Sequence, residues 1–262
     1  MKKFAVFGNP ISHSISPRLH NNAILGLSLD AFYGRVLLND GKDLRDNFLK
    51  LKLNAANITL PFKIDAFRIS DFKSKAADKI GSVNTLVYKN EKFYGYNTDA
   101  FGFWRAVSKI GNFKNAVILG AGGTTRAISY ILHENGVKFD ILNRSDKSNE
   151  NFECENFYTY ENFDTKDYDL IINSTSAGLK DENLPAPKEI LDEILNRAKL
   201  AFDVIYGKVT PFLNLAEKYG LKTSDGAQML VFQAVLALNL FYDNTLNETR
   251  ILKFMNEALK LK

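Results

Sequence analysis

A glycine-rich turn between an apolar strand and a helix constrains this chain more than any other feature. The stretch VILGAGGTTRAI puts Gly120, Gly122 and Gly123 directly after an apolar run, and the pattern predicts a helix from Gly123 to about Glu134. Glycines there permit a tight turn and let backbone N–H groups approach a pyrophosphate, which the start of a helix favours. Because Thr125 takes the place of a third glycine, a merely tight strand-to-helix turn is the alternative.

The surrounding pattern favours an α/β fold. Short apolar runs, NAVILG, FDILN, YDLIIN, LAFDVI and LKTSD, are separated in several places by helical segments. This alternation predicts a Rossmann-like, doubly wound parallel sheet with helices on both faces. Earlier residues mix strands and helices, with a helix that Ser16 caps and a hairpin around Asn90. The predicted boundary lies near Asp99, and the helical C-terminal stretch from about Ala227 is expected to return to the first domain.

The end of the strand after the glycine turn bears on the cofactor. An NAD site would have an acidic residue there to hold the ribose 2′-hydroxyl. The chain has LNRSDK instead, with Asn143 and Arg144 at that position. A guanidinium fits a 2′-phosphate, so Arg144 and Ser145 favour NADP, with Lys147 as a further cation. The nearby negative charge of Asp146 weakens this argument from positive charge. The alternative is that Arg144 is only a solvated arginine at a strand end.

Composition excludes several classes of protein. Cys154 is the single cysteine, so no intramolecular disulfide can form, which fits a reducing compartment such as the cytoplasm. The first ten residues, MKKFAVFGNP, contain too few consecutive apolar residues for a signal peptide. The longest apolar stretch is too short for a membrane span. A net charge of +4 without a dense basic block gives no reason to expect nucleic acid. Three histidines form no metal-binding pattern, so no metal is expected.

A lysine follows an unusual strand end in ANITLPFK. Pro61 stops the strand, and Lys63 follows two residues later. Lys63 is either a solvated loop charge or an amine aimed at a ligand. In GNPISHSISP, Ser14 and Ser16 lie two apart in a turn and could offer hydroxyl groups to a polar ligand. Asp99 could serve a ligand or complement the start of a helix.

Together these stretches resemble the shikimate dehydrogenase family. The similar pieces, in the family's order, are GNPISHSISPRLHN, NITLPFK, GSVNTL, GYNTDAFGF, GAGGTTRAI, LNRS, INSTSAG, DVIYGKVTPFL and DGAQMLVFQA. The resemblance implies an NADP-dependent oxidoreductase that reversibly reduces 3-dehydroshikimate to shikimate in the pathway to chorismate and the aromatic amino acids. It implies a substrate-binding catalytic domain formed by residues 1–98 with 227–262 and an NADP-binding domain formed by residues 99–226.

The resemblance also implies roles for single residues. Lys63 and Asp99 would be the catalytic pair. Substrate contacts would come from Ser14, Ser16, Thr59, Asn84, Tyr206 and Gln233. Cofactor contacts would come from Gly120, Ala121, Gly122, Gly123, Thr124, Asn143, Arg144, Ser145, Asp146, Lys147, Ser148, Val204 and Gly226. Ser148 departs from the family pattern, because many members have a second basic residue there.

Two other functions stay open at this point. One is a quinate/shikimate dehydrogenase that uses NAD or NADP, for which Asp146 is the one nearby acid. The other is a cofactor-binding regulatory protein without catalysis, which the presence of both Lys63 and Asp99 argues against. The sequence leaves the oligomeric state open, with a homodimer as one expectation.

Overall fold

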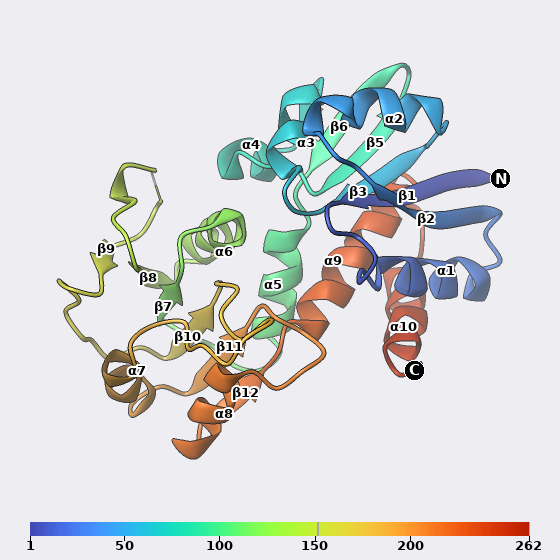
Figure 1. Cartoon of the computed structure of the whole chain (residues 1–262). Helices are drawn as coiled ribbons and strands as arrows, with labels where there is room; N and C mark the ends of the chain where they lie inside the picture. The colour runs from blue at the N-terminus through green and yellow to red at the C-terminus, as the bar shows by residue number, and fades with distance from the viewer. Residues whose placement is uncertain (151, 262) are drawn as a thin grey trace. The chain divides into compact units, whose positions relative to one another are not determined.

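The computed structural model describes residues 1–150 and 152–261, which fold as two compact units (Figure 1). One unit comprises residues 1–102 and 231–262, and the other comprises residues 103–230. The chain leaves the first unit within helix α5 (Asp99–Val107) and returns to it within helix α9 (Ala227–Leu240). The first unit is therefore assembled from both ends of the chain.

The first unit contains a mixed six-stranded sheet in the order β2-β1-β3-β5-β6-β4. Its strands are β1 (Lys2–Gly8), β2 (Ala31–Leu37), β3 (Ala55–Ile58), β4 (Phe72–Lys73), β5 (Thr85–Lys89) and β6 (Lys92–Tyr96). β1 runs parallel to β2 and β3, whereas β5 runs antiparallel to β3 and β6. Asn90 and Glu91 join β5 to β6 with positive φ angles of 52° and 60°. Two such residues suit a tight hairpin, and the predicted hairpin is confirmed.

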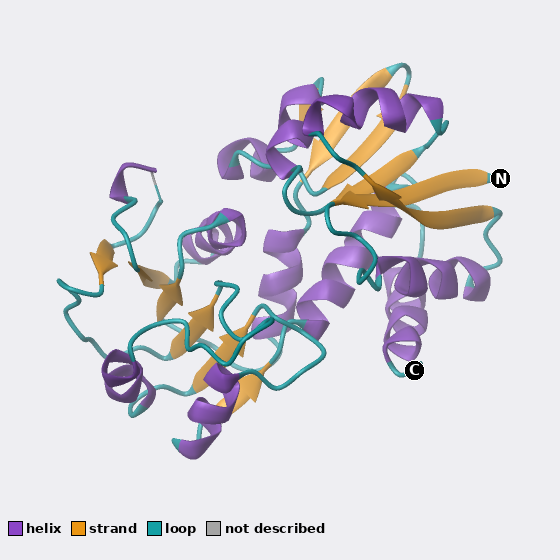
Figure 2. Cartoon of the chain, in the orientation of Figure 1, coloured by secondary structure: helices purple, strands orange, loops and turns teal. Residues whose placement is uncertain are grey.

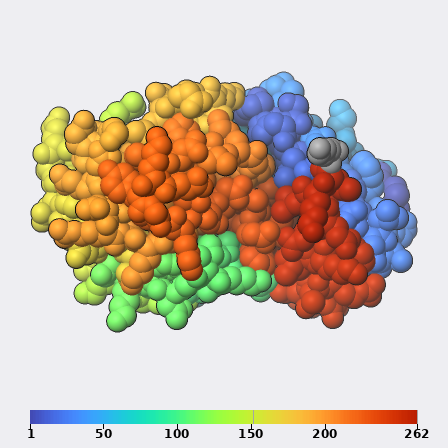
Figure 3. All heavy atoms as spheres, turned by 90° about the horizontal axis from the view of Figure 1, so that it is seen from below, coloured from blue at the N-terminus to red at the C-terminus, as the bar shows by residue number. Residues whose placement is uncertain are grey.

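Helices cover both faces of this sheet (Figure 2). They are α1 (Ser16–Gly26), the 3₁₀ turn η1 (Gly41–Asp43), α2 (Leu44–Lys50), α3 (Lys63–Ile69), α4 (Lys75–Ile80) and α10 (Glu248–Leu259). Successive side chains of a strand point to opposite faces. Phe7 of β1 accordingly stacks on Phe48 of α2 at 6.4 Å between ring centroids, and Phe4 contacts Phe241, after α9, at 4.7 Å. The prediction that the C-terminal helices return to the first unit is confirmed, since α10 packs alongside α1. In Figure 3 the red atoms near the end of the chain accordingly lie against blue atoms from near its start.

The second unit is a parallel six-stranded sheet in the order β12-β11-β10-β7-β8-β9. Its strands are β7 (Asn115–Leu119), β8 (Lys138–Asn143), β9 (Asn156–Thr159), β10 (Leu170–Asn173), β11 (Leu200–Asp203) and β12 (Lys222–Ser224). The connecting helices are α6 (Gly123–Glu134), η2 (Ser148–Glu150), α7 (Lys188–Leu195) and α8 (Pro211–Lys218). The order reverses between β7 and β10, as in doubly wound dinucleotide-binding sheets. The predicted fold class is confirmed, and α6 has the predicted bounds.

Two local predictions were wrong. Ser16 does not cap α1 with its side chain: the helix begins at Ser16 itself, Ile15 holds the cap position, and no side-chain cap is formed. The hydroxyl of Ser14 instead accepts the N–H of Ser16, at 3.4 Å. The strand before Pro61 also ends earlier than predicted, at Ile58, and Lys63 is the first residue of α3 rather than part of a strand end.

Membrane insertion through a helix finds no support in residues 1–150 and 152–261. None of the helices found there is both long enough and apolar enough to cross a bilayer. The most apolar of them, α9, instead supplies buried residues such as Val231 and Leu238.

Candidate active site

The loops that carry most of the predicted substrate residues emerge at one edge of the first sheet. β1 and β3 run parallel, so the segments that follow Gly8 and Ile58 leave at the same edge. β5 starts beside the end of β3, where Asn57 pairs with Thr85, and β6 ends beside the start of β5, where Thr85 pairs with Tyr96. Predicted site residues that adjoin these strand ends are Ser14, Ser16, Thr59, Lys63, Asn84 and Asp99.

Lys63 and Asp99 form an ion pair at this edge. Lys63 Nζ lies 2.6 Å from Asp99 Oδ2, and the two side chains are 16% and 14% exposed. Lys63 opens α3 directly after the buried Phe62, and Asp99 is the first residue of α5, so both side chains start from fixed backbone. An ammonium has three N–H donors. Lys63 can therefore keep its bond to Asp99 and still donate to an oxygen of a ligand.

Asn84 holds the second oxygen of the same carboxylate. Its Nδ2 donates to Asp99 Oδ1 at 2.8 Å and to Thr98 Oγ1 at 3.0 Å. Thr98 Oγ1 lies 3.4 Å from Gln233 Oε1 and 3.2 Å from Asn84 Oδ1, and its one proton can go to either oxygen. The structure thus brings four predicted site residues together, namely Lys63, Asp99, Asn84 and Gln233. The sequence reasoning missed Thr98, although its place beside Asp99 in YNTD was a signal.

The serine turn is fixed by its backbone. Arg35 of β2 donates from Nε and Nη2 to the carbonyl oxygen of Ser14, at 3.0 and 2.6 Å. Ser14 and Ser16 are both buried. Thr59 follows β3, and its N–H donates to the carbonyl of Phe7 at 2.9 Å. Side-chain hydroxyls at these three positions are therefore held on ordered backbone, as a polar ligand site requires.

The glycine turn of the second unit has the backbone that the sequence predicts. Gly120 has φ = +103°, and a Cβ there would lie 2.8 Å from Thr175 Cγ2, so only glycine fits without strain. A Cβ added at Gly122 or Gly123 would meet nothing within 4 Å, so the space over the start of α6 is open on that side. Helix starts leave several N–H groups without an intrahelical partner, which suits an anion in this space.

Thr125 explains how the turn closes without a third glycine. Its hydroxyl donates to the carbonyl of Gly120 and accepts the N–H of Gly122, both at 3.0 Å. It also lies 2.8 Å from the hydroxyl of Ser174, after β10. The side chain that breaks the glycine motif therefore ties the turn to the neighbouring strand, a role that the sequence reasoning missed.

The loop after β8 is basic but partly neutralised. Asn143 Nδ2 donates to the carbonyl of Ser145 at 2.8 Å. Lys147 pairs with Glu150 at 3.3 Å, and the other carboxylate oxygen of Glu150 pairs with Arg126 of α6 at 2.6 Å. Arg126 was not anticipated, although it lies in the first turn of the helix that the glycine motif opens. Both cations thus share one acid close to Arg144 in the sequence.

Asp146 and Ser148 form a local turn within this loop. Asp146 Oδ1 accepts the N–H of Ser148 at 2.8 Å, and this backbone hydrogen bond lowers the pKa of Asp146. The Asp146 carboxylate is therefore charged at neutral pH. Its turn-forming bond gives it a structural role in addition to the cofactor contact that the sequence predicts.

The predicted residues Val204, Tyr206 and Gly226 also belong to the second unit, as do Ala121 and Thr124 of the glycine turn. The N–H of Gly226 donates to the carbonyl of Ile205 at 2.9 Å, and a Cβ at Gly226 would collide with the carbonyl oxygen of Val204. Val204 and Gly226 therefore lie together beyond β11, at the carboxyl edge of the sheet. Burial raises the pKa of Tyr206, so its hydroxyl stays protonated at neutral pH.

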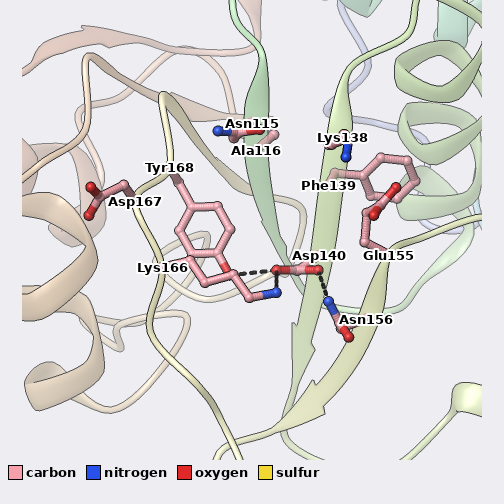
Figure 4. A pocket seen from close by; sticks show the side chains of 10 residues that line it. All are labelled: Asn115, Ala116, Lys138, Phe139, Asp140, Glu155, Asn156, Lys166, Asp167 and Tyr168. Carbon is pink, nitrogen blue, oxygen red and sulfur yellow. Dashed lines mark hydrogen bonds and ion pairs between the residues drawn. The ribbon is translucent and has the colours of Figure 1, made fainter.

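A separate cavity lies at the opposite edge of the second sheet. It has a volume of about 180 Å³ and is lined by Asn115, Ala116, Lys138, Phe139, Asp140, Glu155, Asn156, Lys166, Asp167 and Tyr168 (Figure 4). The buried carboxylate of Asp140 accepts from Lys166, Tyr168 and Asn156 at 2.8–3.0 Å. Dinucleotides bind outside the carboxyl ends of such strands, whereas this cavity adjoins the amino ends of β7 and β8. It is therefore not the cofactor site that the glycine turn indicates.

The strand order and the open glycine turn define a dinucleotide-binding α/β protein. The family model for the shikimate dehydrogenase substrate binding domain matches residues 6–86. A shikimate dehydrogenase (NADP(+)) from Helicobacter hepaticus is 45% identical over 265 residues, which cover 98% of each chain. The chain belongs to the shikimate dehydrogenase family.

Solved structures agree with this assignment. Shikimate dehydrogenase from Aquifex aeolicus superposes with a TM-score of 0.88 at 31% identity, covering 100% of this chain and 98% of the other. Shikimate 5-dehydrogenase from Thermus thermophilus, solved in complex with NADP(H) and shikimate, superposes with a TM-score of 0.85 at 30% identity, covering 98% and 100%. Similarity therefore extends over both units.

Proposed function

We propose that this protein catalyses the reversible, NADP-dependent reduction of 3-dehydroshikimate to shikimate, in the pathway to chorismate and the aromatic amino acids. The observation that carries the proposal is the ion pair between Lys63 and Asp99, set beside Asn84 at the sheet edge where the serine turn also emerges. This arrangement combines a proton donor with polar side chains that suit a polyhydroxylated carboxylic acid. The names of the similar proteins support the same reaction.

The proposed division of labour follows the two units. Residues 1–98 with 227–262 bind the substrate and hold the catalytic pair, and residues 99–226 bind NADP. The match of a substrate-binding family model to residues 6–86 supports the first assignment. Substrate contacts come from Ser14, Ser16, Thr59, Asn84, Tyr206 and Gln233.

The residues of the second unit fit NADP. Open space above Gly122 and Gly123 can accept the pyrophosphate at the start of α6, and Arg144 offers a guanidinium to the 2′-phosphate. The residues proposed to contact the cofactor are Gly120, Ala121, Gly122, Gly123, Thr124, Asn143, Arg144, Ser145, Asp146, Lys147, Ser148, Val204 and Gly226. When bound, NADP supplies the hydride as NADPH and accepts it as NADP⁺.

In the direction of reduction, a hydride joins the carbon of the 3-keto group. The π electrons of the C=O bond move to the oxygen, which takes a proton from Lys63 Nζ and becomes the hydroxyl of shikimate. Asp99 orients the ammonium through its Oδ2, and Asn84 keeps the other carboxylate oxygen in place. In the reverse direction the neutral amine takes the hydroxyl proton as the hydride leaves.

The test is a spectrophotometric assay of nicotinamide reduction, with shikimate and quinate each offered with NADP⁺ and NAD⁺. Turnover of shikimate with a clear preference for NADP⁺ is the expected result. Comparable turnover of quinate, or equal use of NAD⁺, would favour a quinate/shikimate dehydrogenase. No turnover in any combination by folded protein would support a regulatory protein and overturn the proposal.

The proposal includes a cytoplasmic location, for which the single thiol of Cys154 is the support. It also includes a homodimer, which light scattering of the purified protein can test. A monomer at assay concentrations would remove the dimer and leave the proposed reaction untouched.

A further inference from the structure

A line of buried polar side chains runs through the first unit to the catalytic pair. It starts at Tyr33 of β2, passes through Asn57 of β3 and Thr85 of β5, and reaches Asn84. Tyr33 and Thr85 are fully buried, and Asn57 is 6% exposed. Buried polar groups are costly unless each finds a partner, so four such groups in a row need an explanation.

The distances make the line continuous. Tyr33 Oη donates to Asn57 Oδ1 at 2.8 Å, and Asn57 Nδ2 donates to Thr85 Oγ1 at 3.1 Å. Thr85 Oγ1 donates to Asn84 Oδ1 at 3.0 Å. Asn84 Nδ2 then donates to Asp99 Oδ1, whose partner oxygen accepts from Lys63.

Two backbone groups set the direction of these bonds: the N–H of Thr98 orients the amide of Asn84, and the carbonyl of Asn84, which accepts from Asn57 Nδ2 at 3.4 Å, supports the orientation of Asn57. The N–H of Thr98 can only donate, and it points at Asn84 Oδ1 at 2.8 Å, so the amide of Asn84 must turn its NH₂ toward Asp99. The nearest acceptor for the Thr85 proton is then Asn84 Oδ1, which leaves Thr85 Oγ1 to accept from Asn57. The oxygen of Asn57 faces Tyr33 as a result, and Tyr33 must donate.

The start of the line is held firmly. Asn21 of α1 bonds the backbone of Tyr33 on both sides, donating to its carbonyl at 2.8 Å and accepting its N–H at 2.9 Å. The ring of His20 stacks on the ring of Tyr33 at 4.1 Å between centroids. Burial raises the pKa of Tyr33 well above its ordinary value, so the phenol keeps the proton that it donates.

We propose that Tyr33 is a positioning residue for the reaction: through Asn57 and Thr85, its hydroxyl keeps the Thr85 proton on Asn84 Oδ1 and so reinforces the orientation that the Thr98 N–H gives the Asn84 amide, and with it the carboxylate of Asp99. Without the Tyr33 proton, only the 3.4 Å bond from Asn57 Nδ2 to the backbone carbonyl of Asn84 opposes reversal of the Asn57 amide. A reversed amide would take the Thr85 proton, and Asn84 Oδ1 would lose one of the donors that hold it. The inference rests on the proposed function, since it concerns how Lys63 and Asp99 are aligned.

The first test is Tyr33→Phe, which removes only the hydroxyl. We expect the single-turnover rate constant for shikimate oxidation, measured with enzyme in excess, to fall about 3- to 10-fold, as for one hydrogen bond. The KM for shikimate should change less than about twofold, because Tyr33 touches neither ligand. While folded enzyme stays in saturating excess, a partial loss of folded protein changes neither the amplitude, which the limiting shikimate sets, nor the rate constant.

A second pair of variants covers the case in which Tyr33→Phe folds poorly. Thr85→Val breaks the line in its middle, and we expect at least the loss caused by Tyr33→Phe. Thr85→Ser keeps the hydroxyl and should restore most of the wild-type rate constant. Equal rate constants for the valine and serine variants would overturn the proposal.

The matched control is Tyr168→Phe in the second unit. Tyr168 is also a buried tyrosine that donates to a polar side chain, Asp140, at 2.8 Å. It should lose stability without any change in the single-turnover rate constant. If the wild-type protein shows no turnover, both the proposed function and this inference are contradicted. If the wild type is active and folded Tyr33→Phe has the same single-turnover rate constant, only this inference is contradicted.

Discussion

Replacing Asp99 by asparagine tests the catalytic proposal most directly. Both oxygens of the carboxylate accept a hydrogen bond, one from Lys63 at 2.6 Å and one from Asn84 at 2.8 Å. A carboxamide of the same shape has only one acceptor. The amide of Asn84 is already fixed by the N–H of Thr98, so in Asp99→Asn one donor must face another donor.

The expected magnitude follows from these contacts. Removing one partner of a buried ion pair typically costs about 3–5 kcal/mol of folding stability, and the 16% and 14% exposure of the two side chains puts this pair toward the lower end. The loss of kcat is a separate quantity, and we expect about 10²- to 10⁴-fold, the usual contribution of a proton donor that depends on this carboxylate for its orientation. Lys63→Ala should fall in the same range, the usual effect of losing a positioned proton donor, with a much smaller change in KM.

The assay is the single turnover of shikimate with NADP⁺, together with steady-state kcat and KM, for both variants and for the double variant. If Lys63 and Asp99 act as one unit, the double variant should be little worse than the poorer single variant. Fully multiplicative losses would show independent roles. Near-normal kcat in Lys63→Ala, with chemistry limiting the rate, would refute the idea that this lysine is aimed at the substrate.

The second unit supplies a control for the loss of an ion pair as such. Lys166 Nζ lies 3.0 Å from Asp140 Oδ2, and the Asp140 side chain is 4% exposed (Figure 4). Lys166→Ala and Asp140→Asn should lower the melting temperature and leave the rate constant of hydride transfer unchanged. A comparable loss of activity in these variants would show that the effect at Lys63 reflects general destabilisation.

Three other predictions concern binding and stability. Arg144→Ala should weaken NADPH binding roughly 10- to 150-fold in fluorescence titrations and hardly affect NADH, because only the 2′-phosphate loses a partner; equal losses would make Arg144 structural. Ser14→Ala and Ser16→Ala should each raise the KM for shikimate, and Ser16→Ala should keep the melting temperature because its side chain does not cap α1; unchanged KM values would remove both serines from the site. Burial lowers the pKa of His20 from 6.5 to about 3, so between these two pH values the unfolded chain binds a proton at His20 and the folded chain does not. The free energy of unfolding should therefore be at its full value above pH 6.5 and lower by about 2 kcal/mol at pH 5. Hydrogen exchange in α1 measures this loss, and a His20→Phe variant with the same pH dependence would contradict the assignment.

The parts of the fold with strong local signals could be predicted from the sequence. The glycine turn and α6 follow from an apolar strand, small residues and helical spacing within one short stretch. The hairpin follows from Asn90 between two strand patterns, because asparagine tolerates a positive φ. These signals are local, so tertiary packing had little opportunity to override them.

Short elements were harder to predict because packing decides them. The seven residues of α3 are too few to form a stable helix alone, and the burial of Ala66 against the sheet supports them. The edge strand β9 carries no long apolar run and was not anticipated. Ser16 does not cap α1 because the helix begins one residue earlier than predicted, at Ser16 itself, which leaves Ile15 at the cap position.

The polar contacts between residues far apart in the chain could not be predicted from the sequence alone. Tyr33 and Asn57 are 24 positions apart on separate strands, and neither belongs to a recognisable motif. Their contact depends on the register that pairs both β2 and β3 with β1. The ion pair of Lys63 and Asp99 was anticipated through family resemblance, whereas its alignment by Asn84 depends on the direction of the Thr98 N–H.

The interleaved path of the chain sets the order in which its surfaces can be buried during synthesis. Residues 103–230 are continuous, so a ribosome completes the second unit before it has made the last helices of the first. Until α10 and Phe241 emerge, the apolar side of β1 around Phe4 and the flank of α1 have no cover. β1 and α1 are thus synthesised before the second unit but reach their native surroundings after it, and a nascent chain halted near residue 230 exposes the surface that a holding chaperone would bind.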